Sequence, residues 1–204
     1  MIKIISWFTT QTPYEQVIEQ RLIPSLKKLQ LDYHIYPVSS QGDWIKNTQL
    51  KPSVVRQAIN DFPNHDLVIV DADCTINEYP QLFKDIPREY DLGVFRLDRN
   101  AWYGIQGEGF KEKELCSGTL FFRNRPEVME LIESWNRRCY ETNLPDQLAL
   151  QEVIEGFYWL KIYPLPLSYC YINSLPDGSK GKIPVEKPVI THHQASRQLR
   201  QIVR

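Results

Sequence analysis

The stretch DLVIVDADCTINEYPQLF, from Asp66 to Phe83, decides how the rest of the sequence is interpreted. Residues 67–70 are four apolar residues in a row. A run that does not alternate with polar residues is typical of a strand buried on both faces of a parallel sheet. Asp71 and Asp73 follow at once, at the carboxyl end of the strand, where ligands gather in such sheets. Because residues i and i+2 of an extended chain face the same side, the two carboxylates can converge on one point.

Two converging carboxylates predict a bound cation. They repel each other, so one stays protonated unless a positive charge lies between them. A hard divalent cation bound by oxygen ligands removes this conflict, and Mg²⁺ or Mn²⁺ keeps positions open for a substrate phosphate. The alternative from the residues alone is that Asp71 and Asp73 cap the following helix or form a turn.

The segments on either side of this stretch alternate between strand and helix patterns. Runs of β-branched and aromatic residues predict strands, and apolar residues at helical spacing predict helices. The alternation predicts an α/β fold, with a single-domain mixed, mostly parallel sheet flanked by helices. The expected strands are 2–8, 32–38, 66–70, 91–97 and 118–124, and the expected helices are 14–29, 51–59, 125–140 and 143–157.

Composition narrows the class of protein. The 204 residues suit one domain, and the net charge of -1 gives no indication of nucleic-acid binding. From Lys180 to Arg204 there are six basic residues against one acidic residue. Such a tail can meet phosphate or an anionic surface, and the alternative is a solvated basic end without a partner. No run approaches 18 apolar residues, so we expect no transmembrane segment. The apolar start of the chain is too short for a signal peptide, so we expect a cytoplasmic protein.

The four cysteines are widely spaced and include no C-x-x-C pair. This spacing argues against a zinc knuckle or a redox pair, and it does not force a disulfide framework. Cys74, Cys139 and Cys170 are most simply interpreted as buried apolar fillers.

Five pieces of the sequence carry a resemblance to a known family. They are SSQGDWIKNTQLKPSVV (39–55), DLVIVDAD (66–73), LCSGTLFFRN (115–124), LPDQLALQEVI (144–154) and THHQASR (191–197). In this order they resemble the nucleotide-diphospho-sugar glycosyltransferases of the A-type fold, a Rossmann-like fold, and in particular small bacterial and phage-like members.

The resemblance implies transfer of a sugar from a nucleotide-diphosphate-sugar donor, with a UDP-sugar favoured, to a glycan, lipid-linked or protein acceptor. It also implies Mn²⁺ or Mg²⁺ as the cofactor and retention of configuration. The chain of 1–204 would have a nucleotide-binding half, 1–97, and a sugar and acceptor half, 98–204.

The same resemblance implies roles for individual residues. Negative charge that grows on the diphosphate would be stabilised by the cation and by basic residues. The chain offers both His192 and His193 as the histidine ligand, and the resemblance favours His193. Cys116 stands where many relatives have Asn or another polar residue, which leaves the donor sugar open. The implied donor-binding residues are Phe8, Thr9, Thr10, Lys51, Asp71, Gly118 and Arg197; the metal ligands are Asp71, Asp73 and His193; and the residues beneath the reacting sugar are Asp146 and Gln147.

The glycine-rich segment between Asp98 and Glu114 is the expected acceptor loop. Trp102 and Tyr103 on this segment could stack on a sugar ring, or they could pack as part of a lid.

Two functions from other classes remain open. One is a haloacid-dehalogenase-like phosphatase with Asp71 as the nucleophile, because its first motif resembles DADCT. In that family, however, the motif follows the opening strand and a downstream acidic pair binds Mg²⁺, and this chain matches neither feature. The other is a non-catalytic module that binds a nucleotide.

Overall fold

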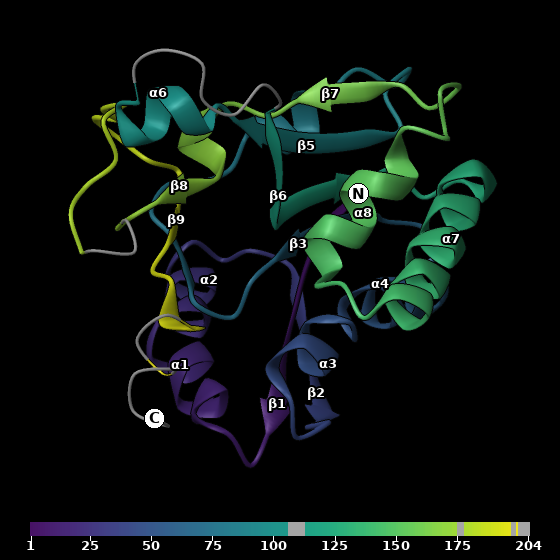
Figure 1. Cartoon of the computed structure of the whole chain (residues 1–204), viewed down its shortest axis with the longest axis horizontal. Helices are drawn as coiled ribbons and strands as arrows, with labels where there is room; N and C mark the ends of the chain where they lie inside the picture. The colour runs from purple at the N-terminus through teal and green to yellow at the C-terminus, as the bar shows by residue number, and fades with distance from the viewer. Residues whose placement is uncertain (106–112, 175–177, 197–198, 200–204) are drawn as a thin grey trace.

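The computed structural model describes residues 1–105, 113–174, 178–196 and 199. Its main feature is a six-stranded sheet with the strand order β2-β1-β3-β6-β5-β7 (Figure 1). The strands are β1 (Ile2–Thr10), β2 (Tyr33–Ser39), β3 (Asp66–Val70), β5 (Leu92–Leu97), β6 (Glu114–Phe122) and β7 (Ile162–Pro164).

The sheet is mixed and mostly parallel, as the sequence predicts. β1 pairs in parallel with β2 and β3, and β5 pairs in parallel with β7. β6 runs antiparallel to both β3 and β5. This antiparallel pairing places the middle of β6 beside the carboxyl end of β3, where the Asp71 N–H donates to the Gly118 carbonyl at 3.0 Å.

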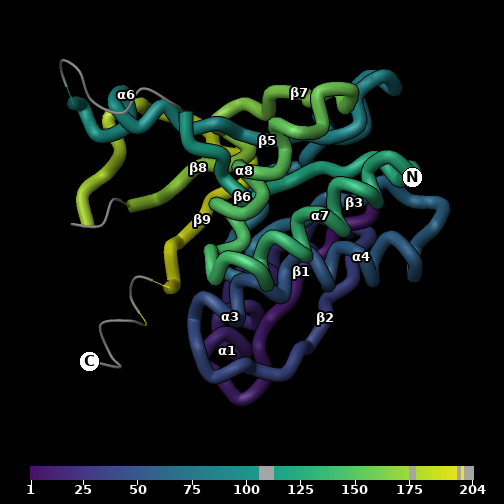
Figure 2. The backbone as a smooth tube through the Cα atoms, turned by 45° about the vertical axis from the view of Figure 1, so that its right-hand side comes forward, coloured from purple at the N-terminus to yellow at the C-terminus, as the bar shows by residue number. Residues whose placement is uncertain are grey.

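Helices cover both faces of the sheet, and β3 shows why its apolar run does not alternate. Leu67 and Ile69 pack in the core beneath α4, α7 and α8, whereas Val68 and Val70 pack in the core beneath α1 and α2. Figure 2 shows α4 and α7 side by side on one face. The helices are α1 (Pro13–Gln20), α2 (Leu22–Lys28), α3 (Trp44–Thr48), α4 (Lys51–Asp61), α5 (Leu82–Asp85), α6 (Arg99–Tyr103), α7 (Pro126–Thr142) and α8 (Asp146–Ile154).

The prediction of one continuous helix over 14–29 is wrong. The structure has two helices, and Arg21 ends α1 and precedes α2. Pro24 gives the physical reason, because it has no N–H to donate to the Gln20 carbonyl and its ring crowds the preceding turn.

A second, three-stranded sheet follows Asp71 and Asp73, which with Ala72 form a D-x-D motif. The strand order of this sheet is β4-β9-β8. β4 is Cys74–Ile76, β8 is Tyr171–Ile172 and β9 is Ile190–His192. β9 pairs antiparallel with β4, so that Cys74 lies directly opposite His192. This small sheet carries the chain segment near residue 190 back to the end of β3. Among the described residues, no helix combines the length and the apolar character needed to cross a membrane.

Candidate functional site

A cleft of about 480 Å³ opens at the carboxyl ends of β1 and β3. It is lined by residues from β1, α3, the D-x-D turn, β6, the start of α8 and β9. Thr10 and His193 are not among its lining residues, and Arg197 lies outside the described residues. The cleft brings together eight of the residues implied by the resemblance: Phe8, Thr9, Lys51, Asp71, Asp73, Gly118, Asp146 and Gln147.

Lys51 is the positively charged centre of this cleft. It lies in the first turn of α4, before Pro52, and is only 4% exposed. Its ammonium lies 2.9 Å from Asp71 Oδ1 and 2.8 Å from Asp146 Oδ2. Burial lowers the pKa of Lys51, but Asp146 and Asp71 raise it by more, so the pKa lies above its ordinary value. The side chain is therefore a fixed cation between two carboxylates.

Asp146 and Gln147, at the start of α8, are both anchored to β6. The Ser117 hydroxyl donates to Asp146 Oδ2 at 2.8 Å, and the Ser117 N–H donates to Gln147 Oε1 at 3.1 Å. The Trp135 indole donates to the Asp146 carbonyl at 2.7 Å and holds the start of the helix in place. Ser117, which bonds to both residues, was not among the predicted site residues. It lies just before the strand expected over 118–124, and a single serine there gives no chemical signal in the sequence.

Gly118 lets the backbone of β6 approach His192 and Asp71 closely. A Cβ at this position would lie 2.5 Å from His192 Cε1 and 3.2 Å from Asp71 Oδ2. The first distance is shorter than any ordinary contact, so the histidine ring rests directly on the glycine backbone. Gly118 is required here for close approach rather than for a special backbone angle.

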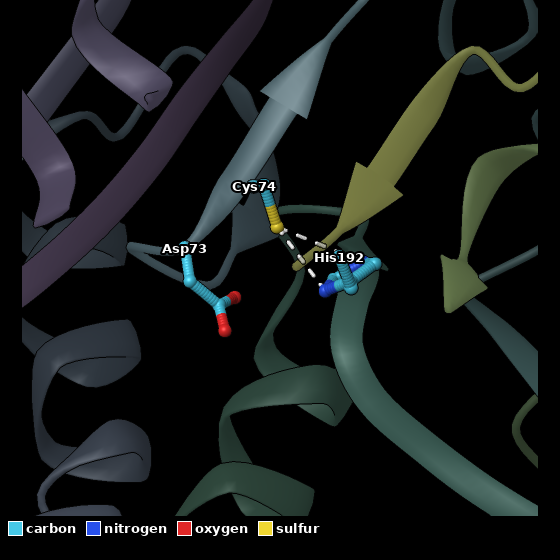
Figure 3. Close-up of side chains that lie close together, drawn as sticks. All are labelled: Asp73, Cys74 and His192. Atoms are coloured by element: carbon cyan, nitrogen blue, oxygen red, sulfur yellow. Dashed lines mark hydrogen bonds between the residues drawn. The ribbon is translucent and has the colours of Figure 1, made fainter. Parts of the chain in front are cut away.

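Asp73, Cys74 and His192 form a buried cluster (Figure 3), and one potential ligand atom from each lies within 4.8 Å of the others. The Cys74 sulfur lies 3.1 Å from His192 Nδ1, and His192 Nε2 lies 2.9 Å from the Thr119 hydroxyl. Asp73 Oδ2 accepts the Ala195 N–H at 2.7 Å. Carboxylate, thiol and imidazole groups in one place are the side chains that bind transition-metal ions.

The surroundings of His192 favour a positive charge. Burial lowers the pKa of His192, but Cys74, Asp71 and Asp73 raise it, so that it lies above its ordinary value. A divalent cation would supply a positive charge at the same place.

The structure separates the two adjacent histidines. His192 lines the cleft, whereas His193 Nε2 lies 2.9 Å from the Thr75 hydroxyl, on the other side of the strand. Burial and the charge of Arg21 lower the pKa of His193. His192 is thus the histidine that lies with Asp73. The sequence alone could not make this choice, because it depends on how β9 aligns with β4.

Part of the expected acceptor loop lies outside the described residues, at 106–112. Within the described part, Trp102 is buried and packs edge to face against Tyr171. A Cβ on Gly181 would lie 2.2 Å from the Trp102 ring, so this ring is packed against the backbone. Of the two roles considered for Trp102, the structure shows packing.

Comparison with solved structures shows which fold this is. The chain is similar to a glycosyltransferase involved in the glycosylation of the major capsid of PBCV-1, with a TM-score of 0.69 and 15% identity over 99% of this chain and 98% of that one. It is also similar to the glycosyltransferase GlyE of Streptococcus pneumoniae TIGR4, with a TM-score of 0.56, 17% identity and 93% of this chain covered. A third similar structure is the bifunctional glycosyltransferase WbbM, with a TM-score of 0.56, 11% identity and 95% of this chain covered.

The chain thus has the fold of these glycosyltransferases, as the resemblance implied. It spans nearly the whole length of the PBCV-1 protein but only 53% of the GlyE chain and 45% of the WbbM chain. No protein-family model matches the sequence, and comparison of the sequence with curated proteins finds no match.

Proposed function

We propose that this chain, with its glycosyltransferase fold, transfers a sugar from a nucleoside-diphosphate-sugar, with a UDP-sugar favoured, to an acceptor, and that it uses a divalent cation. One observation carries the proposal: the convergence of Lys51, Asp71, Asp73, Asp146 and His192 on one cleft at the carboxyl ends of β1 and β3. In α/β sheets this edge is where nucleotides bind.

The charges of the cleft support a divalent cation. Asp71, Asp73 and Asp146 bring three negative charges and Lys51 brings one positive charge, so the neutral-histidine state has a net charge of -2. A divalent cation balances this charge. Asp73 and His192 would hold it, with Asp71 beside them. When bound, Mn²⁺ or Mg²⁺ stabilises the negative charge of a diphosphate leaving group.

The chain's own residues supply the remaining chemistry. Lys51 holds Asp71 and Asp146 at fixed positions and adds positive charge near the diphosphate. Asp146, which also accepts the Ser117 hydroxyl, faces the cleft and suits a sugar that becomes cation-like as its bond to phosphate breaks. Phe8 and Thr9, at the end of β1, would contact the base and ribose.

Retention of configuration is part of the proposal. Its support is the resemblance to members that take a histidine ligand from near the C-terminus. We assign that role to His192 in place of His193, because His192 lines the cleft with Asp73.

Calorimetric titration of UDP and GDP, with and without Mn²⁺, tests the proposal on the wild type and on Asp73→Asn. We expect one nucleotide to bind only with Mn²⁺, and Asp73→Asn to abolish this binding. Asp85→Asn is the matched control, because this exposed aspartate lies on α5 away from the lining of the cleft. Failure of both nucleotides to bind under every metal condition would refute the proposal.

The phosphatase alternative has its own readout, which is Mg²⁺-dependent turnover of p-nitrophenyl phosphate. In the structure the D-x-D strand is the third strand of the chain and lies between β1 and β6. It therefore does not open the fold, as that family's motif strand does.

A further inference from the structure

Cys74 is a cross-strand neighbour of the histidine in the proposed cation site. The register of β4 and β9 places Cys74 opposite His192, and their side chains point toward each other (Figure 3). Directly opposite residues in an antiparallel pair have neighbouring side chains, so the sheet itself enforces the 3.1 Å approach of Cys74 Sγ to His192 Nδ1. The thiol is thus a fixed part of the site and more than a filler of the core.

The histidine ring is oriented as in metal sites. Its Nε2 lies 2.9 Å from the Thr119 hydroxyl, and its Nδ1 faces the thiol. A metal-binding histidine characteristically uses its second ring nitrogen for a hydrogen bond that fixes the ring. Gly118 closes the side of the ring that faces β6, so the ring has little freedom to turn away.

The donor atoms of this cluster differ from those that Mn²⁺ or Mg²⁺ selects. The cluster offers one carboxylate oxygen, one sulfur and one imidazole nitrogen, all within 4.8 Å of one another. Sulfur ligands favour zinc over magnesium and manganese, which prefer oxygen. Three protein ligands with a fourth position left open are typical of zinc sites that also bind a substrate or water.

We propose that Asp73, Cys74 and His192 form a zinc-preferring site, in which Zn²⁺ takes the Cys74 sulfur as a ligand and Mn²⁺ does not. The regulatory consequence, that Zn²⁺ competes with the activating cation, rests on the proposed function. The zinc site itself is independent of it.

Burial of Cys74 does not prevent such binding. In the metal-free protein, burial raises the pKa of the Cys74 thiol to about 12, so the sulfur keeps its proton. A coordinating cation reverses this, because a thiol bound to zinc is deprotonated outright. Zinc with one thiolate and one carboxylate is electrically neutral, so the ion offsets the burial of both anions.

Cobalt substitution gives a readout that does not depend on activity. The full chain, freed of metal with a chelator, is titrated with Co²⁺ while its absorption spectrum is recorded. We expect an intense thiolate-to-cobalt charge-transfer band that saturates at one equivalent and is bleached by stoichiometric Zn²⁺ but not by excess Mn²⁺. A wild-type spectrum with no thiolate band would overturn the proposal, whatever the variants do.

Variants identify which cysteine supplies the sulfur ligand. Cys74→Ser should remove the charge-transfer band and weaken Zn²⁺ binding by at least about tenfold, the lower end of the loss seen even when an outer-shell partner is removed. Its Mn²⁺ affinity should stay within about twofold, since manganese does not use sulfur. Cys116→Ser is the matched control, because this cysteine is buried like Cys74 and lies beside the cleft, but it is not in the cluster. Loss of the band in Cys116→Ser, or its survival in Cys74→Ser, would refute the assignment.

The two proposals fail in distinguishable ways. A cobalt–thiolate band without nucleotide binding would keep the zinc site and reject the transferase. Mn²⁺-dependent UDP binding without the band would keep the transferase and reject the zinc site. If both proposals hold, Zn²⁺ should abolish Mn²⁺-dependent UDP binding by the wild type, or change its affinity. In Cys74→Ser, the same effect should need at least about ten times as much Zn²⁺.

Discussion

Lys51 is a buried cation on which two carboxylates depend for their charge partner. Its ammonium lies between the carboxylates of Asp71 and Asp146, and Asp146 is itself buried. Lys51→Met keeps the length of the side chain but leaves both carboxylates without this partner. We expect the variant to lose about 3–5 kcal/mol of unfolding free energy in urea, the cost of breaking a buried ion pair from one side.

Arg56→Met is the control for this prediction, because Arg56 lies on the same helix but is exposed. Its guanidinium lies 3.5 Å from Glu133, and both side chains are in solvent. Exposed pairs contribute little, so we expect a change below about 1 kcal/mol. Equal losses in the Lys51 and Arg56 variants would contradict the central role of Lys51.

Gly118→Ala tests the close approach of β6 to His192. The added Cβ would lie 2.5 Å from the ring, so the ring or the strand must move. We expect a loss of about 1–3 kcal/mol in unfolding free energy, as for overpacked cores. We also expect Mn²⁺-dependent nucleotide binding to weaken by about tenfold or more, because the ring would leave its position.

Gly156→Ala is the matched variant. A Cβ there would meet the Val153 carbonyl at 3.4 Å, an ordinary contact, and the residue does not have a left-handed backbone angle. The substitution should leave binding unchanged and leave stability unchanged or raised by about 0.4–1 kcal/mol. A loss of binding in Gly156→Ala equal to that in Gly118→Ala would show that the effect is not specific to the site.

Charged residues that directly follow a buried strand could be predicted from the sequence itself. Asp71 and Asp73 are such residues, whereas Lys51 and Asp146 were implied by the family resemblance, and all four line the cleft. The choice between His192 and His193 could not be made in this way, because it depends on the pairing of β4 with β9.

At the scale of elements, Arg123 links several chain segments at the end of the sheet where β3 begins. Its guanidinium lies 2.6 Å from Asp66 Oδ2, at the start of β3, and it donates to the carbonyls of Tyr90, Ile86 and Pro87. Arg123→Ala should therefore lose about 3–5 kcal/mol, measured by urea unfolding. Nucleotide binding by the folded fraction should stay unchanged, because Asp66 and Asp71 lie at opposite ends of β3.

Arg123→Lys sharpens this prediction. A lysine carries the charge but not the planar fork, so it can reach Asp66 but not all the carbonyls, and we expect it to recover only part of the loss. Arg138→Ala is the control, since its partner Glu152 is exposed and the pair should contribute less than about 1 kcal/mol. Full recovery by lysine would mean that charge alone accounts for the effect.

The long elements could be predicted from the sequence, and the short ones could not. The unbroken apolar run of β3 bounds a buried strand, and α7 is long enough for its amphipathic pattern to show a helical period. β4 and β9 have three residues each and β8 has two, which is too few to show alternation. They exist because the chain around them holds them together, and such tertiary information is not present in a local pattern.

At the scale of the whole molecule, a ligand that binds only the folded state must stabilise it. Two core clusters share one sheet, so the described part of the chain should unfold as one unit. With UDP and Mn²⁺ at about 100 times the dissociation constant, we expect about 2.7 kcal/mol of added stability. For a chain of this size the midpoint of thermal unfolding should rise by about 5–10 °C.

Asp73→Asn should remove this rise while leaving the shape of the unfolding transition unchanged. A rise with UDP alone, equal in size and independent of Mn²⁺, would show that the nucleotide binds without the cation. Two separated transitions would show that the two faces of the sheet do not unfold together.

The pairing of Cys74 with His192, which are 118 residues apart, has a consequence for synthesis of the protein. While the chain is still on the ribosome, β3 and its aspartates emerge long before β9 exists. Until β9 has emerged and docked, these carboxylates lack their imidazole partner. A nascent chain halted before residue 190 should therefore fail to bind the cation, whereas one released from the ribosome beyond residue 196 should bind it.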